Sequence, residues 1–429
     1  MAELLRSPAA ASTGARANVL KPGPLEYGFW CFLLVAVGRI GQLFPALSNV
    51  PLGKVVLGIT FLALVAQWKR LPAMVEAAKP VARTGKYLVW LALLLTPISF
   101  WKGASFNFLL HQLPDLVAVT AIAYMMSRSW RFVRGSMLAL VISAILLARF
   151  ALSSYDGGRA ATDTMYDTND LAYVLVTIFP LALGFTLTAR SIPARLLYST
   201  AAFVLVITSL LTQSRGGLLA LTAELVILLF TRTVPGDGRK RRYTATLAAL
   251  GGAALVGVII WSHLPDAARN RFATILDLAS DYNLDPTDTT GRGEIWGRGI
   301  RAALQRPIGY GPNSFSMVDL KFGGRFMAPH NSFIEILVEL GLPGLVLFVA
   351  AYLLALRGLA RVRAALIRRK DPSAEEKDRI VFARLLQVAL VGNAIAGFFL
   401  SMAYSSLLWT LLGTSMALMA LAEREPQSG

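Results

Sequence analysis

Long apolar runs are the feature that most constrains the fold of this chain. Examples are residues 133–150 and 245–261, which contain few charged side chains. A run of about 20 apolar residues matches the hydrocarbon core of a bilayer, which is ~30 Å thick. Of the 429 residues, 55% are hydrophobic and only 16% are charged, whereas a soluble domain is about a quarter charged. The sequence therefore predicts an all-α polytopic membrane protein.

The pattern predicts about twelve transmembrane helices. One outward-facing segment between them is far longer than a hairpin needs. The expected helices are 27–47, 50–67, 87–101, 111–126, 133–151, 170–189, 195–213, 216–232, 243–263, 332–356, 380–401 and 403–421.

The distribution of Lys and Arg predicts the orientation. Basic residues of membrane proteins concentrate in cytoplasmic loops. With a cytoplasmic N-terminus, the inner loops carry most of the basic residues, and both termini are cytoplasmic; the basic clusters lie at 69–70, 79–86, 128–134, 239–242 and 357–384. The net charge of +17 is then a topological signal, and we expect no nucleic acid partner. The polar run within 357–384 is expected to be a solvated connector near anionic lipid.

This topology divides the chain into five parts. We expect a disordered cytoplasmic tail at 1–26, nine helices over 27–263, a long periplasmic loop over 264–331, three helices over 332–421 and a cytoplasmic tail at 422–429. The single cysteine, Cys31, excludes an intrachain disulfide and a cysteine-based metal site.

Two outward segments stand out. Residues 153–170, SSYDGGRAATDTMYDTND, are polar and acidic, and 264–331 form the long loop. Long ordered loops are usually functional. Within the long loop, ARNRFATILDLA and GRGEIWGRGIRAALQ have helical periodicity, and PIGYGPNSF is a Gly/Pro loop. We expect a small helical subdomain on the membrane surface. Its basic residues suit either an anionic headgroup or simple solvation.

Three pieces of sequence could carry chemistry. TQSRGGLLAL places Arg215 at an outer tip, where Gly216 and Gly217 allow close backbone approach. TTGRGEIWGRG places Arg292 at a helix start, where backbone N–H groups also favour an anion. APHNSFIEILVELGLPG places His330 just before a helix that Asn331 or Ser332 could cap.

Each piece also has a plain structural interpretation. Arg215 could be an interfacial side chain whose charged end reaches the water, Arg292 a solvated surface residue and His330 a structural residue. An arginine suits phosphate because its donors form a planar fork. A histidine at the membrane surface can act as a base near neutral pH.

Four charged residues fall inside expected spans: Arg39, Glu224, Glu335 and Glu339. A charge at mid-membrane costs roughly 2.5–3.5 kcal/mol on insertion scales, so such residues are normally paired or line a cavity. Glu335 and Glu339 are four apart and share a helix face. The hypothesis is that Arg39 pairs with Glu224 or Glu339.

In combination these pieces resemble the bacterial O-antigen ligase and polymerase family. The resemblance rests on the order SRGG, then a long loop with GRGEIW and GYGPNSF, then HNSFIEILVELGLPG, over residues 211–344. YDTNDLA at 166–172 is similar to a motif of members encoded in exopolysaccharide clusters. The resemblance implies a fold similar to lipid-dependent GT-C-like glycosyltransferases.

The resemblance also implies an activity. It is a metal-independent, inverting transfer of a glycan from undecaprenyl diphosphate, at the periplasmic face of the inner membrane and without a cofactor. The acceptor is a sugar hydroxyl on lipid A–core or on another lipid-linked repeat. Matching motifs assign the catalytic histidine to His330 and the diphosphate-binding arginines to Arg215 and Arg292. Supporting roles are expected for the following residues: Asn331, Glu335, Glu339 and Arg298.

Two alternatives remain open from sequence. One is a transporter or flippase of lipid-linked glycans, although such folds usually show two related halves and this chain shows no such similarity. The other is a protein O-oligosaccharyltransferase, which would share the same core and differ in its acceptor.

Overall fold

The computed structural model describes residues 21–43, 50–67, 69, 73–162, 166–231, 262, 266–273 and 290–424. The expected helix 243–263 lies outside these residues except for Ser262. All the elements in the described ranges are helical. The first half contains α1 (Pro24–Ala36), α2 (Ile40–Leu43), α3 (Leu52–Ala66), α4 (Lys79–Leu95), α5 (Lys102–Asn107), η3 (Phe108–Gln112), α6 (Leu113–Met125), η4 (Met126–Arg128), α7 (Trp130–Ser153), α8 (Thr168–Thr188), α9 (Ile192–Leu211) and α10 (Arg215–Phe230).

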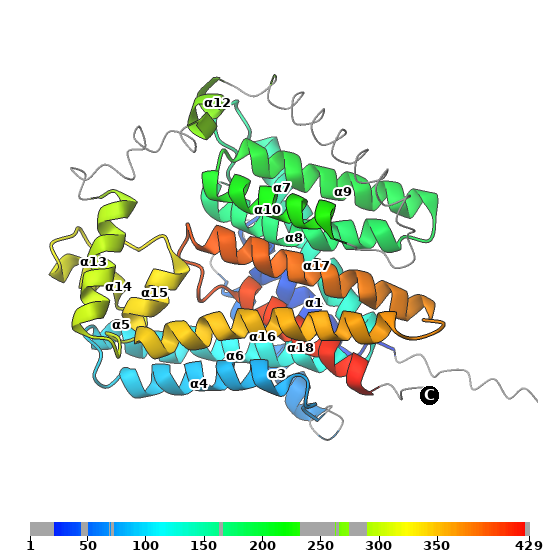
Figure 1. Cartoon of the computed structure of the whole chain (residues 1–429), viewed down its shortest axis with the longest axis horizontal. Helices are drawn as coiled ribbons and strands as arrows, with labels where there is room; N and C mark the ends of the chain where they lie inside the picture. Colours follow the sequence, from blue (N-terminus) through cyan, green and yellow to red (C-terminus); the bar gives the residue numbers. More distant parts are fainter. Residues whose placement is uncertain are drawn as a thin grey trace, which may run out of the picture.

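The second half contains α12 (Asp266–Ala273), α13 (Arg292–Gln305), α14 (Phe315–Lys321), α15 (Ser332–Glu339), α16 (Gly341–Ile367), α17 (Ala374–Gly397) and α18 (Ser406–Arg424). The long helices lie roughly alongside one another in a bundle, and the short helices α13, α14 and α15 gather at one end of it (Figure 1). The helix predicted from GRGEIWGRGIRAALQ is α13.

In the described ranges, seven helical segments are long and apolar enough to cross a membrane. The protein is therefore a polytopic membrane protein, but a count of about twelve spans is not confirmed. Two shorter apolar helices, α1 and α3, add to the bundle. The seven segments are Lys102–Arg128, Trp130–Ser153, Thr168–Thr188, Ile192–Leu211, Gly341–Ile367, Ala374–Gly397 and Ser406–Arg424.

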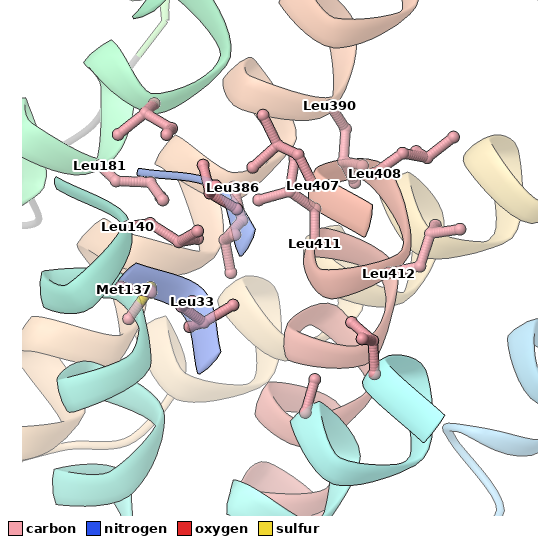
Figure 2. Close-up of a cluster of buried hydrophobic side chains, with 14 of the residues drawn as sticks. Leu33, Met137, Leu140, Leu181, Leu386, Leu390, Leu407, Leu408, Leu411 and Leu412 are labelled. Atoms are coloured by element: carbon pink, nitrogen blue, oxygen red, sulfur yellow. The ribbon is translucent and has the colours of Figure 1, made fainter. Parts of the chain in front are cut away.

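The bundle has an apolar interior and an apolar exterior. Leucines from α1, α7, α8, α17 and α18 meet in its core, as Leu33, Leu140 and Leu411 show (Figure 2). Large apolar side chains are also exposed on α3, α4 and α9, for example Leu62 and Leu94. A soluble monomer rarely exposes such surface, whereas lipid covers it at no cost. The outer face of the bundle is therefore suited to hydrocarbon.

The prediction of one helix over 332–356 was wrong. The chain forms α15, breaks at Leu340, and restarts as α16 at Gly341, whose φ is +71°. The break accommodates the loop after α13: Tyr310 N–H donates to Val338 O and Gly311 N–H to Glu339 O, both at 2.9 Å. A continuous helix would use those carbonyl groups itself.

The prediction of a single helix over 27–47 was also wrong. α1 ends at Ala36, and Arg39 adopts a φ of +48°. The Tyr166 hydroxyl donates to Val37 O at 3.1 Å, and the Arg39 guanidinium stacks on the Tyr166 ring at 3.9 Å. These contacts replace the helical bonding that would continue α1.

Gly341 should be intolerant of a side chain. A Cβ there would lie 2.3 Å from Pro307 O, and the positive φ adds strain. Gly323 also has a positive φ, +87°, but nothing lies within 4 Å of its Cβ position. We expect Gly341→Ala to destabilise the fold by more than ~2 kcal/mol and Gly323→Ala by about 1 kcal/mol. Thermal unfolding in detergent measures both, and equal losses would contradict the clash.

Candidate functional site

A polar cavity of about 110 Å³ lies where α10, α13 and α17 meet the loop before α8. Arg215 and Arg292, predicted from separate motifs, both line it. Arg159 and Asn169 complete its polar wall. Its remaining surface comes from Ser214, Gly216, Gly217, Ala396, Phe399 and Leu400. The cavity thus brings three guanidinium groups together in a small space.

Arg215 is the first residue of α10. The Ser214 side chain caps the helix by accepting from Gly217 N–H at 3.3 Å. A Cβ on Gly216 would lie 2.9 Å from the Phe399 side chain, and one on Gly217 would lie 2.8 Å from Ala172 Cβ. The two glycines therefore let α10 pack closely against α8 and the end of α17. This close packing holds Arg215 at the cavity.

Arg292 is the first residue of α13 and follows the N-cap Gly291. Both predicted arginines are therefore at helix N-termini, where unpaired N–H groups and the helix dipole favour an anion. Arg292 reaches the cavity from α13, whereas Arg215 reaches it from the helical bundle. The cavity thus lies between the membrane helices and the α13–α15 unit.

His330 does not line the cavity but is held beside it. The backbone N–H of His330 donates to Ser401 Oγ at 3.0 Å. Ser401 directly follows Leu400, which lines the cavity. Trp296 Nε1 donates to Pro329 O at 2.7 Å and ties the preceding residue to α13. The φ of His330 is +46°, a conformation that costs energy for a residue with a Cβ. These bonds hold His330 in that strained conformation.

The environment of His330 favours a neutral imidazole. Burial lowers the pKa of the His330 side chain, Arg292 lowers it further, and Asp167 opposes both effects. A neutral imidazole can accept a proton, which a general base must do. Arg292, which lowers the pKa of His330, also lines the cavity.

Asn331 acts as the N-cap of α15. It is fully buried, and its Oδ1 accepts from Phe333 N–H at 2.9 Å and Ile334 N–H at 3.1 Å. Ser332 adds a second anchor, because its hydroxyl donates to Leu400 O at 2.7 Å. Asn331 therefore supports the site by fixing the chain directly after His330.

Arg298 does not line the cavity. It is 3% exposed, and its Nε lies 2.7 Å from Asp319 Oδ1 in a buried ion pair. Asp319 Oδ2 also accepts from the N–H groups of Arg325 and Met327. The pair organises the loop that leads to His330, so the observed contacts of Arg298 are structural.

Glu335 and Glu339 lie in α15, outside the seven candidate spans. Glu339 accepts from Asn313 N–H at 2.8 Å and from the Tyr404 hydroxyl at 2.8 Å. Glu335 accepts from Ala403 N–H at 3.4 Å. Burial raises the pKa of both carboxyl groups, and Glu339 raises that of Glu335 further. The two carboxyl groups join α15 to the loops around it.

The hypothesis that Arg39 pairs with Glu224 or Glu339 was wrong. Glu224 is fully buried, and neither of its carboxyl oxygens has a hydrogen-bond partner within the described part of the chain. Glu339 bonds instead to the loop after α13. Arg39 lies on the ring of Tyr166 because the broken end of α1 directs it there.

Sequence reasoning did not select Arg159 or Asn169. Arg159 lies in the polar outward segment 153–170, and Asn169 belongs to the YDTNDLA stretch. One signal was available: Arg159 is a cation in an otherwise acidic outward segment, against the positive-inside trend. What the sequence did not reveal is that this segment packs against the start of α10.

The residues that the structure describes contain no group of three or more His, Cys, Asp or Glu side chains suited to a metal ion. The charged groups of the cavity are guanidiniums, which bind anions. The arrangement can therefore hold a phosphate-bearing group, with an imidazole at its edge.

One part of the chain is similar to a known family. Residues 200–349 match the family model Wzy_C, described as O-antigen ligase. The matched segment includes Arg215, Arg292 and His330 but not Arg159. No curated protein matches the chain.

The two charges around His330 predict opposite shifts of its pKa. Arg292 lowers the pKa of His330, so the Arg292→Gln substitution should raise that pKa. Asp167 raises the pKa of His330, so the Asp167→Asn substitution should lower that pKa. The chain has three histidines, which makes an NMR titration of ¹⁵N-histidine-labelled protein practical. His111→Gln and His330→Asn would assign the signals. Shifts of the same sign in both variants would contradict this arrangement of charges.

Proposed function

Because residues 200–349 match the O-antigen ligase family model, we propose that this protein is a membrane glycosyltransferase of surface polysaccharide assembly. Members of this family are ligases and polymerases. The proposed donor is a glycan on undecaprenyl diphosphate. The proposed acceptor is a sugar hydroxyl on lipid A–core or on another repeat unit. The proposed location of the reaction is the periplasmic face of the bacterial inner membrane.

The meeting of Arg215 and Arg292 in one cavity carries this proposal. Arg215 and Arg292 are 77 residues apart in the sequence. A planar guanidinium can donate two parallel hydrogen bonds to phosphate oxygens. Two such groups, each at a helix N-terminus, suit a diphosphate better than a single phosphate. The apolar exterior of the bundle suits the polyprenyl chain of such a donor.

His330 is proposed as the base. The acceptor hydroxyl attacks the anomeric carbon, and the bond from that carbon to the phosphate oxygen breaks. The electron pair stays on the diphosphate, where the guanidinium groups stabilise it. The hydroxyl proton moves to the neutral His330 imidazole. A single displacement of this kind inverts the anomeric configuration.

The proposed step uses arginine charge where other enzymes use a metal ion. A diphosphate is already a good leaving group, and preorganised cations stabilise the charge that develops on it. The proposal therefore assigns the leaving group to Arg215 and Arg292 and assigns no role to a metal or other cofactor.

The function can be tested with purified protein in liposomes that contain a lipid-linked glycan and an acceptor. We expect glycan transfer in the presence of EDTA. His330→Asn should reduce the rate of glycan transfer by about 10²-fold or more, because the base is lost. The amount of protein and its unfolding temperature should stay unchanged. Asparagine tolerates a positive φ better than alanine does, so it is the better substitution.

His111→Asn is the matched control, because His111 lies in η3 and is exposed. Glycan movement across the bilayer without transfer would indicate a flippase and would contradict the proposal. Transfer to a peptide and not to a sugar would indicate a protein O-oligosaccharyltransferase.

The fork of Arg215 should matter beyond its charge. Arg215→Lys keeps the charge and loses the bidentate geometry, so we expect the transfer rate to fall roughly 10-fold or more. Arg325→Lys is the control, because Arg325 is exposed and lies outside the cavity. Initial rates of transfer measure both. Equal rates for wild type and Arg215→Lys would show that Arg215 acts as a point charge only.

A further inference from the structure

A surface at one end of the bundle combines exposed apolar side chains with two cations. The turn after α4, the end of α13 with the loop that follows it, and α14 form this surface (Figure 1). We call it the end patch, and its members are Ile98, Leu304, Arg306, Ile308, Leu320 and Lys321. We propose that the end patch lies in the headgroup region of the bilayer and binds an anionic phospholipid there.

The segments of the end patch are fixed to one another. A terminal nitrogen of Arg306 donates to Ile98 O at 2.8 Å, and Phe100 N–H donates to Tyr310 O at 2.8 Å. Both bonds join the turn after α4 to the loop after α13. Lys321 Nζ lies 4.6 Å from the centroid of the Phe100 ring, which brings α14 to the same place. The end patch is therefore one continuous surface.

The apolar members of the end patch continue the exposed apolar surface of α4. Trp90 and Leu94 are exposed on α4, and Ile98 follows four residues later. In the adjoining end of α13, Leu304 is 75% exposed. A patch of this kind in water is unfavourable, whereas acyl chains cover it without cost. The end patch therefore lies where hydrocarbon meets the headgroups.

The two cations lie against aromatic rings. The guanidinium carbon of Arg306 is 5.4 Å from the centroid of the Tyr310 ring, and Lys321 Nζ is 6.0 Å from it. The face of an aromatic ring attracts a cation and so orients it. Arg306 is half-buried and Lys321 is exposed. Both positive charges are therefore held at the surface, within reach of one or two neighbouring headgroups.

The two segments that form the end patch contribute no exposed carboxylate. Residues 79–110 contain no acidic residue, and residues 295–326 contain only Asp319. Asp319 is 2% exposed and pairs with Arg298. Cations beside apolar side chains complement a lipid that joins a phosphate to acyl chains. A zwitterionic headgroup also carries a positive charge that Arg306 and Lys321 would repel, so an anionic phospholipid fits better.

A lipid bound at the end patch would hold one part of the protein at the bilayer surface. α13 ends at the patch and begins with Arg292. A headgroup on Arg306 and Lys321 therefore keeps α13 and α14 level with the headgroups of that leaflet. The cavity lined by Arg292 then stays near the depth at which any membrane lipid presents its headgroup.

Quenching by brominated lipids tests the proposal on the full chain in nanodiscs. Cys31→Ser removes the single cysteine, and Leu304→Cys then carries a fluorescent label in the end patch. Asp371→Cys is the control, because Asp371 is exposed in the connector between α16 and α17. We expect brominated acyl chains to quench the label at position 304 and to quench it much less at position 371. An unquenched label at position 304 would place the patch in water or against another protein and would overturn the proposal.

Headgroup preference is measured in phosphatidylcholine nanodiscs with a small, fixed fraction of brominated lipid. Brominated phosphatidylglycerol should quench the label at position 304 about fivefold more than brominated phosphatidylcholine does. Arg306→Gln with Lys321→Gln should bring this ratio to about one. The charge-matched control is Arg131→Gln with Lys377→Gln, which changes exposed cations at the other end of the bundle and should keep the ratio.

Conservative variants separate lipid binding from a structural role. Arg306→Lys with Lys321→Arg keeps both charges and should keep the ratio, whereas its loss in this variant would overturn the proposal. Equal quenching by the two lipids in wild type would also overturn it. Soluble glycerol phosphate should leave the ratio unchanged, and competition by it would indicate a site for free phosphate instead. No glycan substrate is needed, so these results do not depend on whether the protein transfers glycans.

Discussion

Direct packing of one backbone against another, at the junction of α15 and α16, is the contact on which the rest of the site depends. Gly309 and Gly341 both have positive φ. A Cβ on Gly309 would collide with the backbone at Glu339, and a Cβ on Gly341 would collide with the backbone at Pro307. Leu342 N–H also donates to Pro307 O at 2.8 Å. This contact fixes the loop after α13 to the first turn of a long membrane helix. Arg292 and His330 lie on either side of this loop in sequence, so its position constrains both.

The fold was predictable where one physical effect dominated. Apolar runs in α7, α8 and α17 identify long helices, because hydrocarbon requires about 20 such residues. Hydropathy does not predict the helix breaks at Gly341 and Arg39, because tertiary contacts cause them. At Gly341 the carbonyl groups of α15 bond to a loop more than twenty residues earlier. At Arg39 the Tyr166 side chain takes over. Local hydropathy contains neither contact.

The same distinction applies to the candidate site. Arg215, Arg292 and His330 were proposed from local motifs, and the structure places the two arginines in one cavity with the histidine beside it. Arg298 was expected to have a supporting role, and it forms a buried ion pair with Asp319. Arg159 was not selected, because its position at the cavity depends on the pairing of Gly158 and Ala160 with the segment before α10. A single sequence reveals residue types but not which distant loops meet.

The composition of the cavity has a consequence for biogenesis. Its walls come from the loop before α8, the start of α10, the start of α13 and the end of α17, so they extend from Arg159 to Leu400. A nascent chain inserts its helices in order during synthesis. The cavity therefore does not exist until nearly the whole polypeptide has entered the membrane. In an incomplete chain, the arginines that line it would not yet lie together.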